Sequence, residues 1–217
     1  MKKLILAAIA VTCAVSVYAQ GTVAFDNRTA AGTSHVWGPS TINPNLSLRG
    51  NAPTGDRPAG TTDYLAAGMT LSVAGSGYRA QILGLNGANQ PEASLIPMSG
   101  TTTFRTGAGA GFLALATATL AGIPVDSPVA TLQLAAWDNS SGLYPTWAAA
   151  FPAWQAGLIA AGTGAPLNVE AIGGGFNTPP NIPFTSFNIY FIPIPEPGSF
   201  ALLGLGAAAL LIFRRRK

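Results

Sequence analysis

Hydrophobic and polar residues alternate with a period of two along five short stretches of the chain, and residues 112–116 begin a longer apolar strand or pair of strands. Each alternating stretch puts apolar side chains on one side of an extended backbone and polar ones on the other, which is typical of a half-buried β-strand. The predicted strands cover residues 22–26, 69–73, 78–82, 112–116, 131–136 and 187–191. Turn signals separate them at residues 75–77, 86–87, 107–111, 123–124 and 139–142. Residues 38–62 and 173–183 are rich in Gly, Pro, Asn and Thr and are predicted to be long loops.

One segment, residues 146–161, has the period of a helix instead. Large apolar side chains recur there at spacings of 4, 3 and 4 residues, as Trp147, Phe151, Trp154 and Leu158. This spacing puts them on one helical face, and Pro152 would kink the helix or mark a second start. The whole pattern predicts a mainly β fold: an antiparallel β-sandwich, jelly-roll or immunoglobulin-like, with a short helical insertion.

The composition agrees with a β-rich domain. Only 9% of the 217 residues are charged, whereas about a quarter is usual. A helical bundle needs Lys and Glu on its exposed faces, so this low charge, with 26 Gly and 17 Pro, argues against one. The predicted domain spans residues 20–194, which is long enough to bury a hydrophobic core without disulfides.

Residues 1–19 predict a secretory signal peptide. Two lysines precede an apolar run over residues 4–17, and small side chains precede a predicted cut between Ala19 and Gln20. An uncleaved anchor is the alternative interpretation. The only cysteine, Cys13, lies in this run, so cleavage would leave the mature chain without a thiol or a disulfide.

The C-terminal end predicts a transmembrane helix. Residues 198–213 carry no charge, and as a helix they would extend roughly 24 Å, slightly short of a hydrocarbon core of about 30 Å. The last four residues are all basic: Arg214, Arg215, Arg216 and Lys217. This basic stop would stay in the cytoplasm by the positive-inside rule, whereas the N-terminal signal puts the preceding chain outside. The N-terminal signal and the C-terminal basic residues therefore predict the same membrane topology. If residues 198–213 were a buried core helix, this agreement would not be required.

A short proline motif precedes this helix. Pro195, Glu196 and Pro197 exclude helical backbone and leave the peptide extended. The order of Pro-Glu-Pro, apolar helix and basic tail over residues 195–217 resembles the PEP-CTERM sorting signal of Gram-negative bacteria. The resemblance implies an exosortase, a membrane-embedded transpeptidase-like enzyme, as partner, with the tail removed or exchanged. It also implies a passage through the secretion machinery and the inner membrane to the cell surface or extracellular matrix. A plain C-terminal anchor is the alternative.

The segments GTVAFDNR, YRAQILGL, TTTFRTGAGAGF and TLQLAAWD follow one another in this order along the domain. In this respect the chain resembles a group of uncharacterised secreted PEP-CTERM proteins from Verrucomicrobia-like and Planctomycetes-like bacteria. That resemblance implies no known activity.

The net charge of +3 belongs to the terminal segments, which hold six of the eleven Lys and Arg residues. Between Gly21 and Pro195 there are five arginines and seven acids. Nucleic-acid binding requires a basic surface that neutralises phosphates. A mildly acidic domain therefore excludes nucleic acid as a partner.

The domain offers few groups for catalysis. His35 is the only histidine. Asp26 and Asp138 are the aspartates considered for a Ser-His-Asp arrangement with it, but no G-x-S-x-G nucleophile elbow is present. One histidine and no cysteine are too few for an ordinary zinc site. The glycine-rich residues 107–111 lack the lysine of a phosphate loop and precede a strand-like run, so they predict a turn. We expect no enzymatic activity and no cofactor.

Two Asp-Asn pairs remain as weak calcium candidates. Asp26 and Asp138 each end a predicted strand and are each followed by asparagine, so both sites offer oxygen ligands. Asp-Asn also ends strands because it forms turns, and we favour that interpretation. A pair of carboxylates that are distant in sequence but close in space, as in a glycoside hydrolase, is the remaining use of the seven acids.

Aromatic residues provide a further alternative, because their faces stack on the apolar side of sugar rings. The candidates are Trp37, Trp137, Trp147, Trp154, Tyr64, Tyr78, Tyr144 and Tyr190. Core packing is the commoner use of such residues. We therefore expect a non-enzymatic surface or matrix protein, with a structural or adhesive role in extracellular polymer or biofilm. A secreted carbohydrate-binding module that holds extracellular polysaccharide is the first alternative, and a secreted glycoside hydrolase is the second.

Overall fold

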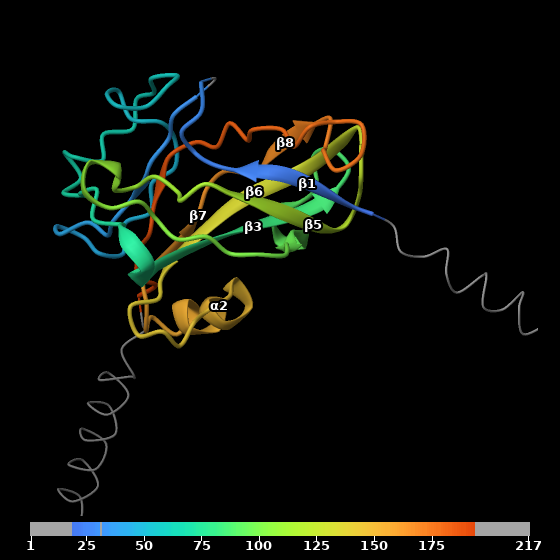
Figure 1. Ribbon diagram of the computed structural model, residues 1–217. Helices are drawn as coiled ribbons and strands as arrows, with labels where there is room; N and C mark the ends of the chain where they lie inside the picture. Colours follow the sequence, from blue (N-terminus) through green and yellow to red (C-terminus); the bar gives the residue numbers. More distant parts are fainter. Residues whose placement is uncertain (1–18, 31, 194–217) are drawn as a thin grey trace, which may run out of the picture.

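The computed structural model describes residues 19–30 and 32–193, and these form a mainly β fold (Figure 1). The strands are β1 (Gln20–Phe25), β2 (Val36–Trp37), β3 (Tyr78–Asn86), β4 (Ile96–Pro97), β5 (Ala116–Pro124), β6 (Val129–Asp138), β7 (Ala161–Thr163), β8 (Leu167–Glu170) and β9 (Phe187–Asn188). The helix α2 is Trp147–Gln155, and single 3-10 turns lie at Gly75–Gly77, Glu92–Ser94 and Gly107–Gly109. The predicted β-rich class with one helical insertion is confirmed.

The strands form three open sheets. The largest has the order β4-β3-β6-β7, and β8 also pairs with β6. β1 and β5 form an antiparallel pair, whereas β2 and β9 pair in parallel. The parallel pair departs from the predicted all-antiparallel arrangement. The jelly-roll or immunoglobulin-like assignment stays a prediction.

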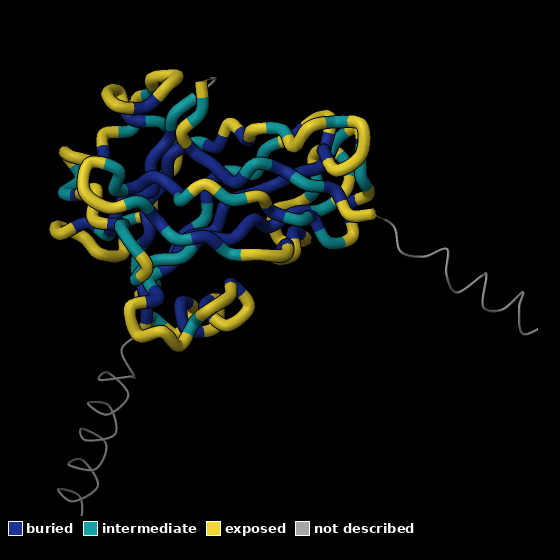
Figure 2. Tube along the Cα trace, in the orientation of Figure 1, coloured by how far each residue is buried: buried dark blue, intermediate teal, exposed yellow. Residues whose placement is uncertain are grey.

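The main core lies between the β1–β5 pair and one face of the large sheet, which are drawn one over the other in Figure 1. It includes Phe25 of β1, Leu120 of β5, and Leu132 and Leu134 of β6. The alternate residues of β6 point the other way, so Ala135 packs into a second core beneath α2. Because both faces of β6 are covered, its central eight residues are all buried, as the dark strand interiors of Figure 2 show.

Residues 69–73 are not a strand, contrary to the alternation. Their backbone hydrogen bonds go to separate segments, since Gly38 N–H donates to Thr70 C=O and Gly111 N–H donates to Val73 C=O. Met69 and Val73 are buried, but the intervening Leu71 is 38% exposed. Period-two alternation of hydrophobic residues without a neighbouring strand in register is therefore not sufficient to form a strand here.

Two other predicted strands begin or end elsewhere. In the predicted strand 112–116, the ladder starts only at Ala116, and Leu113 forms an isolated bridge to Phe104. Within 187–191, only Phe187–Asn188 is a strand. The predicted loops 38–62 and 173–183 contain no named strand, which confirms them.

The predicted helix 146–161 is shorter than expected and ends at Gln155. Gly157 has φ 67°, its N–H donates to Trp154 C=O, and Leu158 N–H donates to Ala153 C=O. These two bonds form a Schellman motif, in which glycine in the left-handed region stops the helix. Leu158 consequently falls outside α2 and is 66% exposed.

The predicted signal peptide and transmembrane helix lie almost wholly outside the described residues. Only Ala19, at the predicted cut, is described, and it is exposed. Across residues 19–30 and 32–193, no helix is sufficiently long and apolar to cross a membrane.

Candidate functional site

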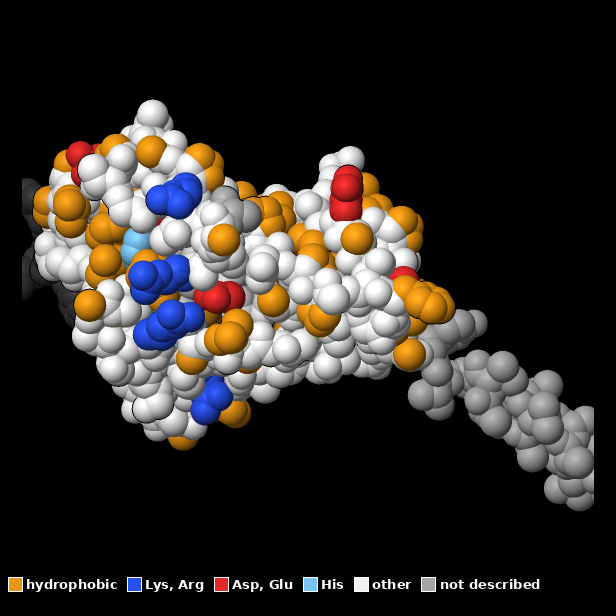
Figure 3. Space-filling view, turned by 45° about the horizontal axis from the view of Figure 1, so that its top comes forward, with side chains coloured by type: hydrophobic (Ala, Val, Ile, Leu, Met, Phe, Trp, Pro, Cys, Tyr) orange, Lys and Arg blue, Asp and Glu red, His pale blue; other side chains and the backbone are white. Residues whose placement is uncertain are grey.

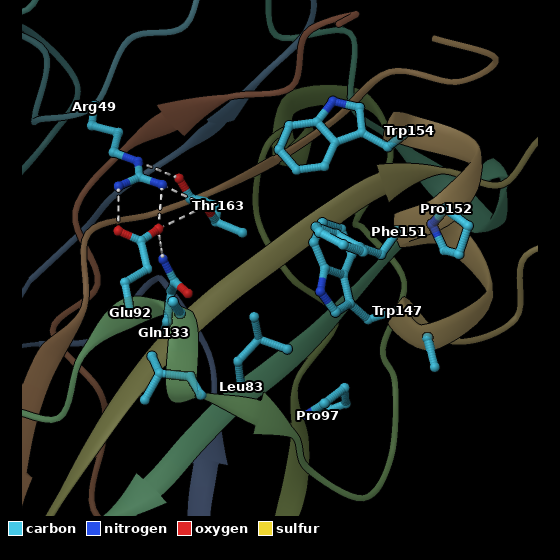
Figure 4. A pocket seen from close by; sticks show the side chains of 13 residues that line it. Arg49, Leu83, Glu92, Pro97, Gln133, Trp147, Phe151, Pro152, Trp154 and Thr163 are labelled. Atoms are coloured by element: carbon cyan, nitrogen blue, oxygen red, sulfur yellow. Dashed lines mark hydrogen bonds and ion pairs between the residues drawn. The ribbon is translucent and has the colours of Figure 1, made fainter. Parts of the chain in front are cut away.

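A pocket of about 520 Å³ opens between α2 and the face of the large sheet that carries the second core (Figure 4). α2 contributes aromatic side chains on one side. A loop, a 3-10 turn and the strands β6 and β7 contribute Arg49, Glu92, Gln133 and Thr163 on the other. Leu83 and Pro97 lie between the two sides. The size and the mixture of apolar and polar groups are those of a small-ligand site, for which roughly 300–1,000 Å³ is usual.

The aromatic side is built by consecutive turns of α2. The Trp147 ring lies 5.6 Å from the Phe151 ring and 5.7 Å from the Trp154 ring, centroid to centroid. The Trp154 indole is fixed, because its Nε1 donates to Tyr190 C=O, and the backbone N–H of Trp147 donates to Gln81 Oε1 at the start of the helix. Each indole is 6% exposed, whereas Phe151 is 44% exposed. Phe151 is therefore the solvent-accessible ring, and the two buried tryptophans pack against it.

The polar side is centred on an ion pair between Arg49 and Glu92. The two guanidinium nitrogens Nη1 and Nη2 donate to the two carboxylate oxygens at 3.1 and 2.7 Å. Arg49 Nε also donates to Thr163 C=O at 2.8 Å, which fixes the plane of the guanidinium. This bidentate geometry is the strong form of an arginine–carboxylate pair.

Gln133 joins the ion pair to the sheet. It lies in β6, is 1% exposed, and its Nε2 donates to Glu92 Oε1 at 2.6 Å and to Gly164 C=O at 2.8 Å. Both amide hydrogens are thereby used. Within the part of the chain that the structure describes, no group donates to Gln133 Oε1, which remains as an acceptor at the pocket (Figure 4).

The charges of this side are balanced. Hydrogen bonds from Arg49 hold the pKa of the Glu92 carboxyl below its usual range, and those from Gln133 and Thr163 act in the same direction. Glu92 is therefore ionised at neutral pH and compensates the arginine. The pocket can bind an uncharged ligand with one apolar face, which would stack on Phe151, and with polar groups at its edge.

His35 does not pair with Asp26 or Asp138. It is 7% exposed, and its Nδ1 lies 2.6 Å from Oδ1 of the buried Asp56. Ser186 Oγ donates to the other oxygen of Asp56 at 2.6 Å and accepts from His35 N–H. The serine therefore bonds to the aspartate and not to the histidine ring, which is not the arrangement that activates a nucleophile.

The two calcium candidates lie in turns. Asp26 Oδ1 accepts from Arg28 N–H at 2.9 Å, and Asp138 Oδ1 accepts from Ser140 N–H at 2.8 Å. These bonds to the backbone two residues on are the ordinary Asx-turn geometry. Among the described residues, no three His, Cys, Asp or Glu side chains gather as a metal site.

The remaining aromatic candidates pack elsewhere. Trp137 is fully buried, and its Nε1 donates to Tyr144 C=O. Trp37 stacks on Tyr64 with the centroids 4.9 Å apart, in a third cluster. Of the four tryptophans, the structure thus brings only Trp147 and Trp154 to the pocket.

Sequence reasoning missed the polar side of the pocket. Arg49 and Thr163 come from a loop and a short strand, with no local motif to connect them. Gln133 carried the one available signal, because it is a polar residue in the middle of the apolar run of residues 129–138. A buried polar side chain of this kind requires partners.

Comparison with known families identifies one segment. The family described as the PEP-CTERM protein-sorting motif matches residues 193–217. This motif implies export through exosortase-type sorting, so the protein is secreted, transits the membrane and ends at the cell surface. The motif residues Pro195, Glu196 and Pro197 and the basic stop at residues 214–217 lie outside the described residues. Searches of curated proteins and of solved structures return no match to the chain.

Proposed function

We propose that this protein is a non-enzymatic surface or matrix protein whose β-sandwich domain holds extracellular polymer by binding neutral saccharide in the pocket beside α2. The observation that carries the proposal is the exposed Phe151 ring opposite the balanced Arg49–Glu92–Gln133 group. A pyranose ring has an apolar face that suits an aromatic ring, and its hydroxyls suit carbonyl and carboxylate acceptors. The sorting motif supports the location that this role requires.

The pocket supports binding more than hydrolysis. Glycoside hydrolysis uses two carboxyl groups, one of which is protonated when it acts as an acid. Among the described residues, Glu92 is the single carboxylate that lines this pocket. Its pKa is lowered by Arg49, so it is unsuited to donate a proton at neutral pH.

The delivery steps belong to the same proposal. Residues 1–19 act as a cleaved signal peptide, and the helix at residues 198–213 holds the exported domain at the inner membrane until an exosortase processes it at Pro195-Glu196-Pro197. The domain is then released to the surface or matrix. The agreement in topology between the two charged ends of the sequence supports this order.

Tryptophan fluorescence of the exported protein tests saccharide binding, because Trp147 and Trp154 line the pocket. We expect a neutral polysaccharide, with dextran and a β-glucan as the first probes, to change the emission. Phe151→Ala should weaken binding roughly two- to tenfold, since a lost aromatic contact is worth about 0.5–1.5 kcal/mol.

Leu158→Ala is the matched control, because Leu158 is similarly exposed and close in sequence but does not line the pocket. It should bind as the parent does. A flat response to every neutral polysaccharide, or equal binding by the Phe151→Ala and parent proteins, would refute the saccharide site.

A further inference from the structure

Three of the five arginines in the described ranges lie on a different face of the molecule, near the packed rings of Phe112 and His35. The Arg28 guanidinium lies 5.2 Å from the centroid of the Phe112 ring. The backbone N–H of Arg105 donates to Phe112 C=O, Arg57 follows the aspartate that pairs with His35, and the imidazole of His35 packs on the Phe112 ring with the centroids 4.3 Å apart. Figure 3 shows arginine side chains gathered on both sides of the single imidazole. We call Arg28, Arg57 and Arg105 the arginine face.

Backbone pairing aligns Arg57 with Arg28. Thr33 forms antiparallel bridges to Arg28 on one side and to Arg57 on the other. Residues directly opposite in antiparallel bridges point to the same side, so both arginines project from one surface. Two strand spacings separate their backbones, which is about 10 Å.

The positive charge of this face is only weakly compensated. Arg28 and Arg57 are exposed, and across residues 19–30 and 32–193 neither guanidinium has a carboxylate partner. Arg105 reaches Asp26 only at 3.6 Å. The nearby Asp56 has no exposed side-chain surface, and its oxygens already accept from His35, Ser186 and Ala52. The face is thus cationic on a domain with more acids than bases.

A cleft of about 360 Å³ adjoins the arginine face. It is lined by His35 and Trp37 on one side, by Leu65 and Leu71 on another, and by Gly55, two residues before Arg57. Trp37 Nε1 is buried, and within the described chain it has no hydrogen-bond partner. A concave site with aromatic and apolar lining beside paired cations suits a ring that carries a carboxylate.

We propose that the arginine face and its cleft bind an acidic saccharide, such as a uronate unit of an anionic polysaccharide. Each exposed guanidinium can hold one carboxylate in bidentate fashion, and the cleft takes the apolar side of a ring. Membrane binding by charge needs clusters of about four to eight cations, and nucleic-acid binding usually involves more phosphate contacts than three arginines supply. This site lies apart from the pocket beside α2 and takes ligands of a different charge.

Affinity gel electrophoresis or calorimetry of the exported protein with polygalacturonate tests the proposal. We expect binding that dextran does not compete for and that falls strongly when salt is raised to about 0.5 M. Arg57→Gln should weaken it roughly tenfold, and the double variant Arg28→Gln/Arg57→Gln should abolish it. Arg79→Gln removes the same charge from a side chain that bonds to Thr101 and should bind within about twofold of the parent.

Two further comparisons separate this proposal from its alternatives. Phe151→Ala should retain polygalacturonate binding even if it loses neutral saccharide, so the two sites can fail independently. Unchanged thermal midpoints in the arginine variants would show that they fold. The proposal is overturned if the parent does not bind polygalacturonate, if it binds only phosphatidylglycerol vesicles or single-stranded DNA, or if the Arg79→Gln and Arg57→Gln variants lose binding equally.

Discussion

Gln133 shows how a single residue connects the core to the surface of this protein. Its backbone lies in the fully buried strand β6, yet its amide group ends beside the Arg49–Glu92 ion pair. Leaving a buried amide unpaired costs about 1–3 kcal/mol. Two partners therefore hold the Glu92 carboxylate in place: Gln133, which is part of the sheet, and Arg49, which comes from a loop. The polar side of the pocket is preorganised as a result.

Glu92→Gln should lower the free energy of unfolding at neutral pH. The Arg49 and Glu92 side chains are 38% and 43% exposed, so solvent weakens their pair and we expect a loss of about 0.5–1 kcal/mol. Because the folded-state pKa of Glu92 is lowered, its contribution is full above the unfolded pKa and is lost as the pH falls through the folded value. Urea unfolding near pH 7 and in acid measures the difference, which should become smaller as the pH falls.

Glu170→Gln provides the control for net charge, since Glu170 is exposed and forms no ion pair within the described chain. It should change the unfolding free energy little at either pH. A loss for Glu92→Gln that persists in acid would show that the effect does not come from the ionised carboxylate.

At the scale of elements, α2 positions the accessible aromatic ring. Its first turn follows Thr146, and the Schellman motif at Gly157 fixes its last turn next to Trp154. Pro152 lies inside the helix without ending it. The stop therefore comes from the glycine, and Pro152 does not mark a second start, because α2 is continuous from Trp147 to Gln155.

Gly157→Ala should destabilise the protein by about 1–2 kcal/mol, because φ 67° is unfavourable for a residue with a Cβ atom. Urea unfolding measures the loss. The same variant should weaken saccharide binding at the pocket, since the end of α2 carries Trp154. Gly77→Ala is the control, because Gly77 has no positive φ and an added Cβ would meet its nearest neighbour at 3.9 Å. Equal losses for the two variants would contradict the proposed role of Gly157.

The alternation of hydrophobic and polar residues predicted a strand correctly where a neighbouring strand pairs with that segment. The predicted strands at residues 22–26, 78–82 and 131–136 are confirmed as β1, β3 and β6, because each has a long antiparallel partner. Residues 69–73 have the same pattern but no partner in register, so local periodicity could not distinguish them from a strand. The pairing of distant segments, such as Thr163 with Arg49, depends on topology, which is why the polar side of the pocket was missed.

At the scale of the whole molecule, the terminal targeting segments and the domain between them differ in charge. The terminal segments hold six of the eleven cations, and the domain between Gly21 and Pro195 has five arginines against seven acids. The sequence alone showed this division, because the PEP-CTERM motif is local and continuous. It could not show that three of those arginines share one face, since residues 28, 57 and 105 are brought together only by folding.

The central claim is that the terminal signals deliver residues 20–194 to the outside as a surface domain. Fractionation of cells with and without exosortase, followed by mass spectrometry of the mature protein, tests it most directly. The account predicts a surface or matrix protein that begins at Gln20 and lacks the chain from Gly198 onward in the wild type alone. The same intact C-terminal tail in both strains, with the protein held in the inner membrane, would contradict it.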